Sequence, residues 1–270
     1  MNKGVVSVLV AYLIWGLYPF YFHAMQHVAP TEIVIHRVLW TFALLAVYLF
    51  CSRRWRWIQK AITDRRTVAV FLMSSVLITA NWSTYTYAIV TNQTLEASLG
   101  YFMNPLVSVL LGTVFLKEKL NKAQMLAIVF ACAGVMWVTF KQGEFPALGL
   151  TLALSFGFYG LVRKMAPLGS LEGLTLETAF AFPVALLATF YFAGNGDLTF
   201  VHGTSWDKFW LIMAGPITTI PLILFAYGLK QVPYSTVGFI QYLSPTMVFF
   251  IGLFFFGEEL QVDRLIGFIL

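Results

Sequence analysis

Polar and aromatic residues recur at helical spacing inside the long apolar segments of this chain. Trp15 and Tyr18 lie three positions apart, and Asn81 and Tyr85 lie four apart, so each pair shares one face of a helix. Aromatic faces combined with amide and hydroxyl groups are typical of a site that binds a small organic solute. The same combination returns in two further groups, which are Tyr101 with Asn104, and Gln241 with Tyr242 and Ser244.

A structural role explains the same residue types. Within a membrane, Asn, Gln and Ser form hydrogen bonds between helices, and aromatic stripes often pack without binding anything. Both interpretations apply to each residue taken singly. Because polar groups that face lipid are costly, the set as a whole favours a cavity lined by at least some of its members.

The segments that carry these residues are long enough to cross a membrane. The chain has 270 residues, of which 59% are hydrophobic and 11% charged, and a soluble domain of this size could not bury so much apolar surface. A bilayer core of roughly 30 Å needs about 20 apolar residues per helix. The apolar runs predict nine complete spans, at residues 4–22, 31–51, 67–90, 94–116, 121–140, 145–161, 171–192, 207–229 and 234–256.

The chain contains the same pattern twice, 140 positions apart. Pro105 and Glu118 in the first copy correspond to Pro245 and Glu258 in the second. We therefore divide the chain into a first five-helix unit, residues 1–140, and a second unit, residues 141–270, whose last helix is incomplete. The counterpart of that helix is a full span, so we expect the natural protein to continue past residue 270.

The distribution of Lys and Arg indicates how the two units are oriented. With the N-terminus in the cytoplasm, most of the 17 basic residues fall on the cytoplasmic side, as the positive-inside rule demands. The net charge of +5 is explained in this way, without nucleic acid as a partner. Five helices per unit force the second copy to enter from the opposite side, so the repeats are predicted to be inverted. The linker at 117–119 is net positive and its copy at 257–259 is net negative, as inversion requires.

The repeat also links the candidate residues to one another. Tyr101 and Asn104 align with Gln241 and Ser244, and with one residue of slippage Trp15 and Tyr18 align with Phe156 and Tyr159. A twofold axis in the membrane plane would place these sets around one central space. Pro105 and Pro245 each remove a backbone hydrogen bond at mid-helix, which provides either a hinge or a static kink.

Charged residues inside the spans are candidates for gating or coupling. Arg37 and Glu177 occupy equivalent positions in the two units, but inversion would separate them by roughly 15 Å in height, because a helix rises about 1.5 Å per residue. We expect local partners, namely Glu96 or His36 for Arg37. For Glu177 we expect Arg163 or Lys164. Such pairs could latch the outer and inner gates alternately, or they could be purely structural. Glu96 and Glu177 are also candidates for a carboxyl group that couples transport to protons.

Enzymatic chemistry finds no support in the sequence. The sequence contains no zinc-protease motif, no Gly-rich phosphate loop and no Cys/His cluster, so we expect no metal, no cofactor and no catalytic residues.

Five stretches make the chain similar to a known family. It resembles the drug/metabolite transporter superfamily, in its EamA branch, and within that branch the RarD-type proteins. The stretches that carry the resemblance are Ala11–Gly16 (AYLIWG), Glu32–Arg37 (EIVIHR), Leu95–Pro105 (LEASLGYFMNP), Phe158–Lys164 (FYGLVRK) and Gln241–Thr246 (QYLSPT). The resemblance implies ten helices in two inverted repeats, with the fifth and tenth helices peripheral and a central cavity. It also implies export or exchange of amino acids, metabolites or drugs in the bacterial inner membrane.

From residues and resemblance together, we expect an all-helical membrane transporter that works by alternating access. Its partners would be a small-molecule substrate, the lipid bilayer and, in a coupled mechanism, protons. A membrane sensor or lipid-interacting scaffold without turnover is the alternative, although such a protein needs no inverted symmetry.

Overall fold

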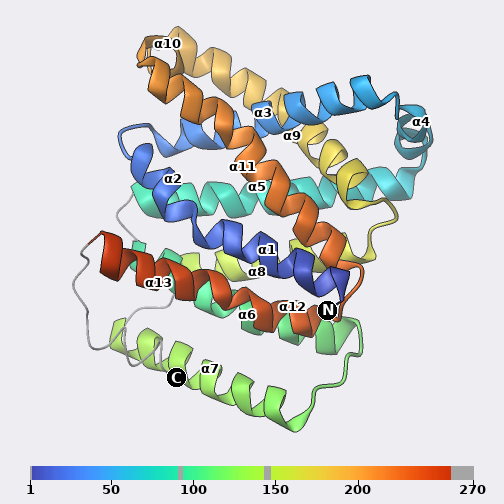
Figure 1. Cartoon of the computed structure of the whole chain (residues 1–270), viewed down its shortest axis with the longest axis vertical. Coiled ribbons are helices and arrows are strands. Elements are labelled where there is room, and N and C mark those ends of the chain that lie inside the picture. Colours follow the sequence, from blue (N-terminus) through green and yellow to red (C-terminus); the bar gives the residue numbers. More distant parts are fainter. Residues whose placement is uncertain (1, 91–93, 143–146, 257–270) are drawn as a thin grey trace.

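The computed structural model describes residues 2–90, 94–142 and 147–256, which form a bundle of crossing helices (Figure 1). The helices that coincide with predicted spans are α1 (Lys3–Gly16), α2 (Tyr18–Ala24), α3 (Pro30–Ser52), α5 (Arg65–Val90), α6 (Thr94–Phe115), α7 (Lys122–Gln142), α8 (Ala147–Met165), α9 (Ser170–Gly194), α11 (Ser205–Leu229), α12 (Tyr234–Gln241) and α13 (Leu243–Phe255). Two short helices, α4 (Arg56–Thr63) and α10 (Thr199–His202), lie in the connections α3–α5 and α9–α11.

All nine predicted spans therefore coincide with helices, but two of them are interrupted. The first is broken at Leu17, between α1 and α2, and the ninth at Tyr242, between α12 and α13. A proline follows each interruption, and Pro19 and Pro245 lack the N–H groups that would bond the carbonyls four residues earlier. Pro105, in contrast, lies inside the continuous helix α6. The predicted tenth helix lies outside the described residues.

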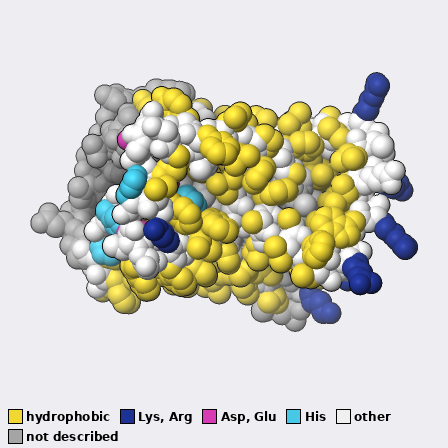
Figure 2. Space-filling model, turned by 90° about the horizontal axis from the view of Figure 1, so that it is seen from above, with side chains coloured by type: hydrophobic (Ala, Val, Ile, Leu, Met, Phe, Trp, Pro, Cys, Tyr) yellow, Lys and Arg dark blue, Asp and Glu magenta, His cyan; other side chains and the backbone are white. Residues whose placement is uncertain are grey.

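The surface of the bundle is that of a membrane protein. Six spans in the described part of the chain are long and apolar enough to cross a membrane, with α1–α2 and α12–α13 each counted as one. Large exposed apolar side chains such as Phe50 and Phe254 cover the flanks. Figure 2 shows this apolar belt between one end that is rich in Lys and Arg and an opposite end where His side chains gather.

The interior is built by helices from both halves of the chain. Helix α1 packs against α11, α5 packs against α8, and α6 packs against both α8 and α12. The main cluster of buried apolar side chains joins these helices through residues such as Tyr12, Tyr159 and Phe225. Helix α7 lies at the edge of the bundle beside α6 (Figure 1).

Carboxylates from distant segments close two helix N-termini. Glu118 accepts hydrogen bonds from the backbone N–H groups of Tyr234 (2.6 Å) and Ser235 (2.7 Å), at the start of α12. Glu32 accepts from the N–H groups of Thr199 (3.0 Å) and Phe200 (2.7 Å), at the start of α10. Because these N–H groups have no partner within their own helices, each carboxylate ties one half of the chain to the other.

Candidate functional site

The structure brings three of the predicted aromatic residues together in the centre of the bundle. The ring centroid of Trp15 in α1 lies 5.9 Å from that of Phe156 in α8 and 5.4 Å from that of Phe225 in α11. Tyr159 stacks on Phe225, with ring centroids 6.4 Å apart. Phe225, which the sequence analysis did not single out, contacts all three of the predicted rings.

A second row of rings leads from the same region towards the surface. Tyr18 contacts Phe22, Phe22 contacts Tyr85, and Tyr85 contacts Tyr101, with ring centroids 5.9 to 6.0 Å apart. Tyr101 is 44% exposed, whereas Trp15, Tyr18 and Tyr85 are partly buried. The helices that supply these residues are α2, α5 and α6. The predicted residues thus form two aromatic groups. The groups adjoin because Trp15, in the first, and Tyr18, in the second, are only three residues apart in the chain.

The amide groups have different environments. The side-chain N–H group of Asn81 donates to the Leu152 carbonyl and to the Ser155 hydroxyl, both at 3.0 Å, so Asn81 joins α5 to α8. The Nδ2 group of Asn81 therefore forms hydrogen bonds between helices, as the structural interpretation of this residue predicts. The Oε1 of Gln241 lies 3.3 Å from the Ser108 hydroxyl, which ties α12 to α6.

Asn104 and Tyr242 retain unused polar atoms. Asn104 is 4% exposed, and its Oδ1 has no hydrogen-bond partner in the described part of the chain. The Tyr242 hydroxyl, at the interruption between α12 and α13, is likewise buried without a partner there. A buried polar atom without a partner costs about 1–3 kcal/mol, which a bound solute would relieve. Ser244 lies in the first turn of α13 and is partly buried.

Arg37 does not pair with its neighbour His36, which was one of its two expected partners. Its Nε donates to the Thr218 hydroxyl in α11 at 2.9 Å, and its guanidinium group lies over the Trp82 ring, 4.2 Å from the centroid. His36 instead accepts from the Trp40 indole on its Nδ1. Sequence spacing could not show this, because the partners of Arg37 come from other helices. The other expected partner, Glu96, lies outside the residues whose side chains are described.

Glu177 has the expected partner. Its Oε1 lies 3.3 Å from Nε of Arg163, and both side chains are 1% exposed. The Ser74 hydroxyl donates to the same oxygen at 2.5 Å, and the Tyr159 hydroxyl donates to Oε2 at 3.3 Å. Through Tyr159 this buried ion pair is connected to the central aromatic group.

The ends of α8 and α11 are held together at the end of the bundle rich in Lys and Arg. Lys164 donates from Nζ to the carbonyls of Leu229 (2.8 Å) and Val232 (2.5 Å). Lys230 donates in the opposite direction, to the carbonyls of Ala166 (2.8 Å) and Leu168. Partial burial lowers the pKa of the Lys230 ammonium, and the nearby charge of Arg163 lowers it further. The two lysines satisfy carbonyls at helix C-termini, where cations are favoured.

A hydroxyl group repairs the backbone of α11 where proline interrupts it. Pro221 has no N–H group to bond the carbonyl of Ile217, four residues earlier. The Tyr18 hydroxyl donates to that carbonyl over 2.8 Å. Tyr18 therefore belongs to the second row of rings and also fixes α2 against the proline-containing segment of α11.

This arrangement predicts a coupled effect of two substitutions. Tyr18→Phe leaves the Ile217 carbonyl without a donor and should cost about 1–2 kcal/mol of stability. Pro221→Ala restores a backbone N–H group that can bond that carbonyl, so Tyr18→Phe should cost markedly less in this background. Melting temperatures of the four proteins in detergent provide the double-mutant cycle. Equal costs in both backgrounds would contradict the assignment.

The sequence and the fold are similar to those of known proteins. The chain is similar to an uncharacterized transporter of Pseudomonas aeruginosa, with 39% identity over 99% of this chain and 90% of that one. It is also 37% identical to Protein RarD of Escherichia coli, over 99% of this chain and 90% of the relative. A solved crystal structure with 13% identity superimposes with a TM-score of 0.70, covering 98% of this chain and 94% of the other, which confirms the fold alone. The profile of the EamA-like transporter family matches residues 2–140 and again residues 146–270. The chain belongs to the EamA-like transporter family, and so is a multi-pass membrane protein.

Proposed function

We propose that this protein is a secondary-active transporter that exports or exchanges small organic solutes of the drug, metabolite or amino-acid type. The site would lie at mid-depth between the two halves of the chain. The observation that carries the proposal is that two of the predicted cavity residues, Asn104 and Tyr242, each have a buried polar atom without a hydrogen-bond partner in the described part of the chain. Because no acidic or basic cluster was found at mid-depth in the sequence, the cargo is proposed to be uncharged or zwitterionic.

The two halves are proposed to be inverted five-helix repeats, residues 1–140 and 141–270, in the bacterial inner membrane with the N-terminus in the cytoplasm. Three observations support this. The family profile matches each half separately. The short helices α4 and α10 occupy corresponding places, between α3 and α5 and between α9 and α11. Lys and Arg gather at one end of the apolar belt, as cytoplasmic residues do (Figure 2). The ten-helix count includes a last helix outside the described residues.

We propose that the end rich in Lys and Arg is the closed end in this structure. Helices α6 and α12 lie close together at Gly238, where an added Cβ would lie 2.9 Å from the Pro105 carbonyl oxygen. Beyond this crossing, Ser108 contacts Tyr234 and Glu118 binds the start of α12. Pro105 thus lies at the crossing, and the Pro245 region contains a break. We propose that the halves rock about this crossing, so that the closed end opens as the other end closes.

The Arg163–Glu177 pair is proposed as the latch of the closed end. It joins α8 to α9, and Ser74 adds α5 to the same carboxylate. A proton taken up by Glu177 would cancel its charge and weaken the ion pair, which would couple proton entry to opening. Arg37, at the corresponding place in the first half, would hold the other end through Thr218. Glu96 stays a second candidate for the coupling carboxyl group.

Counterflow in proteoliposomes distinguishes a carrier from a sensor or scaffold without turnover. Liposomes loaded with unlabelled solute should accumulate the labelled solute only if the protein exchanges it. The solutes are chosen by thermal shift of the purified protein with amino acids, nucleosides and amphenicols. We expect at least one to stabilise the protein, and Asn104→Ala to abolish both the shift and the counterflow. A solute that stabilises the protein but shows no counterflow would support the scaffold instead.

The latch predicts that stability and transport can be separated. Glu177→Leu leaves Arg163 buried without a counter-charge and should cost about 3–5 kcal/mol. Arg163→Leu combined with Glu177→Leu removes both charges and should recover most of that stability while transport stays at least tenfold below wild type. Melting temperature and counterflow are measured on the same preparations. Wild-type transport by the double variant would refute the latch.

For the outer end, Arg37→Gln should lose transport and stay folded.

A further inference from the structure

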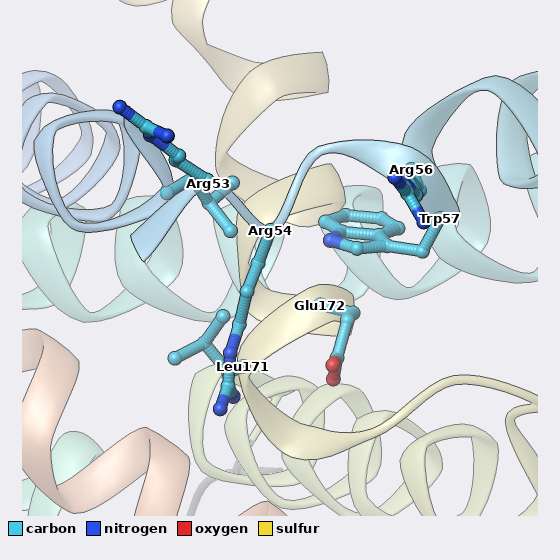
Figure 3. A pocket seen from close by; sticks show the side chains of 7 residues that line it. Arg53, Arg54, Arg56, Trp57, Leu171 and Glu172 are labelled. Carbon is cyan, nitrogen blue, oxygen red and sulfur yellow. The ribbon is translucent and has the colours of Figure 1, made fainter. Parts of the chain in front are cut away.

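A pocket of about 430 Å³ lies at the end of the bundle that is rich in Lys and Arg, away from the proposed solute site. It is formed where α3 ends, α4 begins and α9 starts (Figure 3). Its polar lining consists of Arg53, Arg54, Arg56, Trp57 and Glu172, and Leu49 and Leu171 supply its apolar part. Nothing in the proposed transport mechanism uses these residues.

The charge of the pocket is positive and uncompensated. Among the described residues, none of the guanidinium groups of Arg53, Arg54 and Arg56 has a hydrogen-bond or carboxylate partner, and all three residues are exposed. The carboxylate of Glu172 lies against Gly169, at the start of its own helix. Its charge therefore serves the N-terminus of α9 rather than the arginines. Three arginines and one glutamate line the pocket, so its formal charge is positive.

Trp57 adds a fixed donor to these mobile charges. Its ring packs against the cluster of Ala61, Phe71, Ala166 and Leu176, which holds the indole in place. Its Nε1–H group is buried and has no acceptor in the described part of the chain. Figure 3 shows the indole nitrogen turned towards the space between Trp57 and Arg54, whose side chain runs past Leu171. An acceptor placed in this space would relieve the unpaired N–H group.

The backbone holds Arg53 in a conformation that glycine would adopt more easily. Arg53 has φ 52° and ψ 31°, and it ends α3 by donating its N–H group to the Phe50 carbonyl at 3.4 Å. A non-glycine residue in this left-handed region costs of order 1 kcal/mol. The turn that results brings Arg54 to the start of α9. The chain therefore places an arginine, and not glycine, at a strained corner beside the pocket.

We propose that this pocket binds the phosphate of an anionic phospholipid headgroup. The phosphodiester would accept from the Trp57 indole and from Arg54, while Arg53 and Arg56 turn towards it from the rim. Leu49 and Leu171 would receive the glycerol backbone, and the exposed side chain of Phe50, 74% exposed on α3, would contact the acyl chains. At the end of the bundle rich in Lys and Arg, beside the exposed apolar flank, the pocket would lie at the depth of the lipid headgroups. A lipid there would brace the start of α9, the helix that carries Glu177.

Titration of the full-length chain in a neutral detergent tests this site. Dioctanoyl phosphatidylglycerol should raise the melting temperature in a saturable way, and dioctanoyl phosphatidylcholine should not. Trp57→Phe keeps the ring and removes the donor, and Arg54→Gln removes the charge. Each should weaken the apparent affinity at least tenfold, because each variant removes a hydrogen bond to a charged group. Arg65→Gln, an exposed basic residue outside the pocket, is the matched control and should change the affinity less than twofold.

Three outcomes would overturn the proposal. If Arg65→Gln weakens binding as much as Arg54→Gln, the attraction is diffuse surface electrostatics. If inorganic phosphate at the same concentration stabilises the protein as well as the lipid does, the ligand is a free anion. If folded Trp57→Phe binds phosphatidylglycerol as wild type does, the indole is not a ligand. None of these results depends on whether the protein transports a solute.

Discussion

The bilayer requires a partner for every backbone polar group, and this constraint governs the structure more than any single contact. Water cannot satisfy a helix end or a proline gap at membrane depth, so a side chain from another segment has to do so. Tyr18 serves the Ile217 carbonyl that Pro221 leaves free, and Glu118 serves the first N–H groups of α12. Lys164 and Lys230 serve carbonyls at each other's helix ends. Each of these side chains connects helices that are distant in sequence.

These connections explain how a bundle of apolar helices can hold a polar site. The candidate residues Tyr18 and Tyr242 lie at or beside the interruptions at Leu17 and Tyr242, where helical backbone bonding is weakest and side chains of neighbouring turns diverge. Such broken helices are the usual place for solute sites in transporters with internal repeats. Tyr18 stands beside Pro19 in α2 and repairs the gap that Pro221 leaves in α11, so one side chain links two segments that contain proline.

Periodicity and the internal repeat predict much of this fold. The nine helical segments, the ion pair of Glu177 with Arg163, and the meeting of Trp15 with Phe156 all follow from residue spacing. The break at Leu17 could also have been found, because Pro19 stands at the same kind of position as Pro245. What spacing cannot provide is the choice of partner across helices.

The misses have that common cause. Thr218 and Trp82 as neighbours of Arg37, Phe225 as the central ring, and Glu118 as the cap of α12 depend on crossing angles between helices far apart in the chain. Asn81 shows the limit most clearly: its position in the helix fits either a cavity or an interhelical bond, and only the proximity of Leu152 and Ser155 decides the role of its Nδ2 group.

The proposed mechanism requires two halves that cross the bilayer in opposite directions, and side-specific labelling tests this arrangement most directly. Ile62 in α4 and His202 in α10 are exposed residues at corresponding places in the two halves. In a background without Cys51 and Cys132, both of which are exposed, Ile62→Cys and His202→Cys are introduced singly and treated with a membrane-impermeant maleimide in intact cells. The inverted arrangement predicts that only the cysteine at position 202 reacts from outside. The cysteine at position 62 should react only after the membrane is permeabilised. Labelling of both positions from the same side would contradict it.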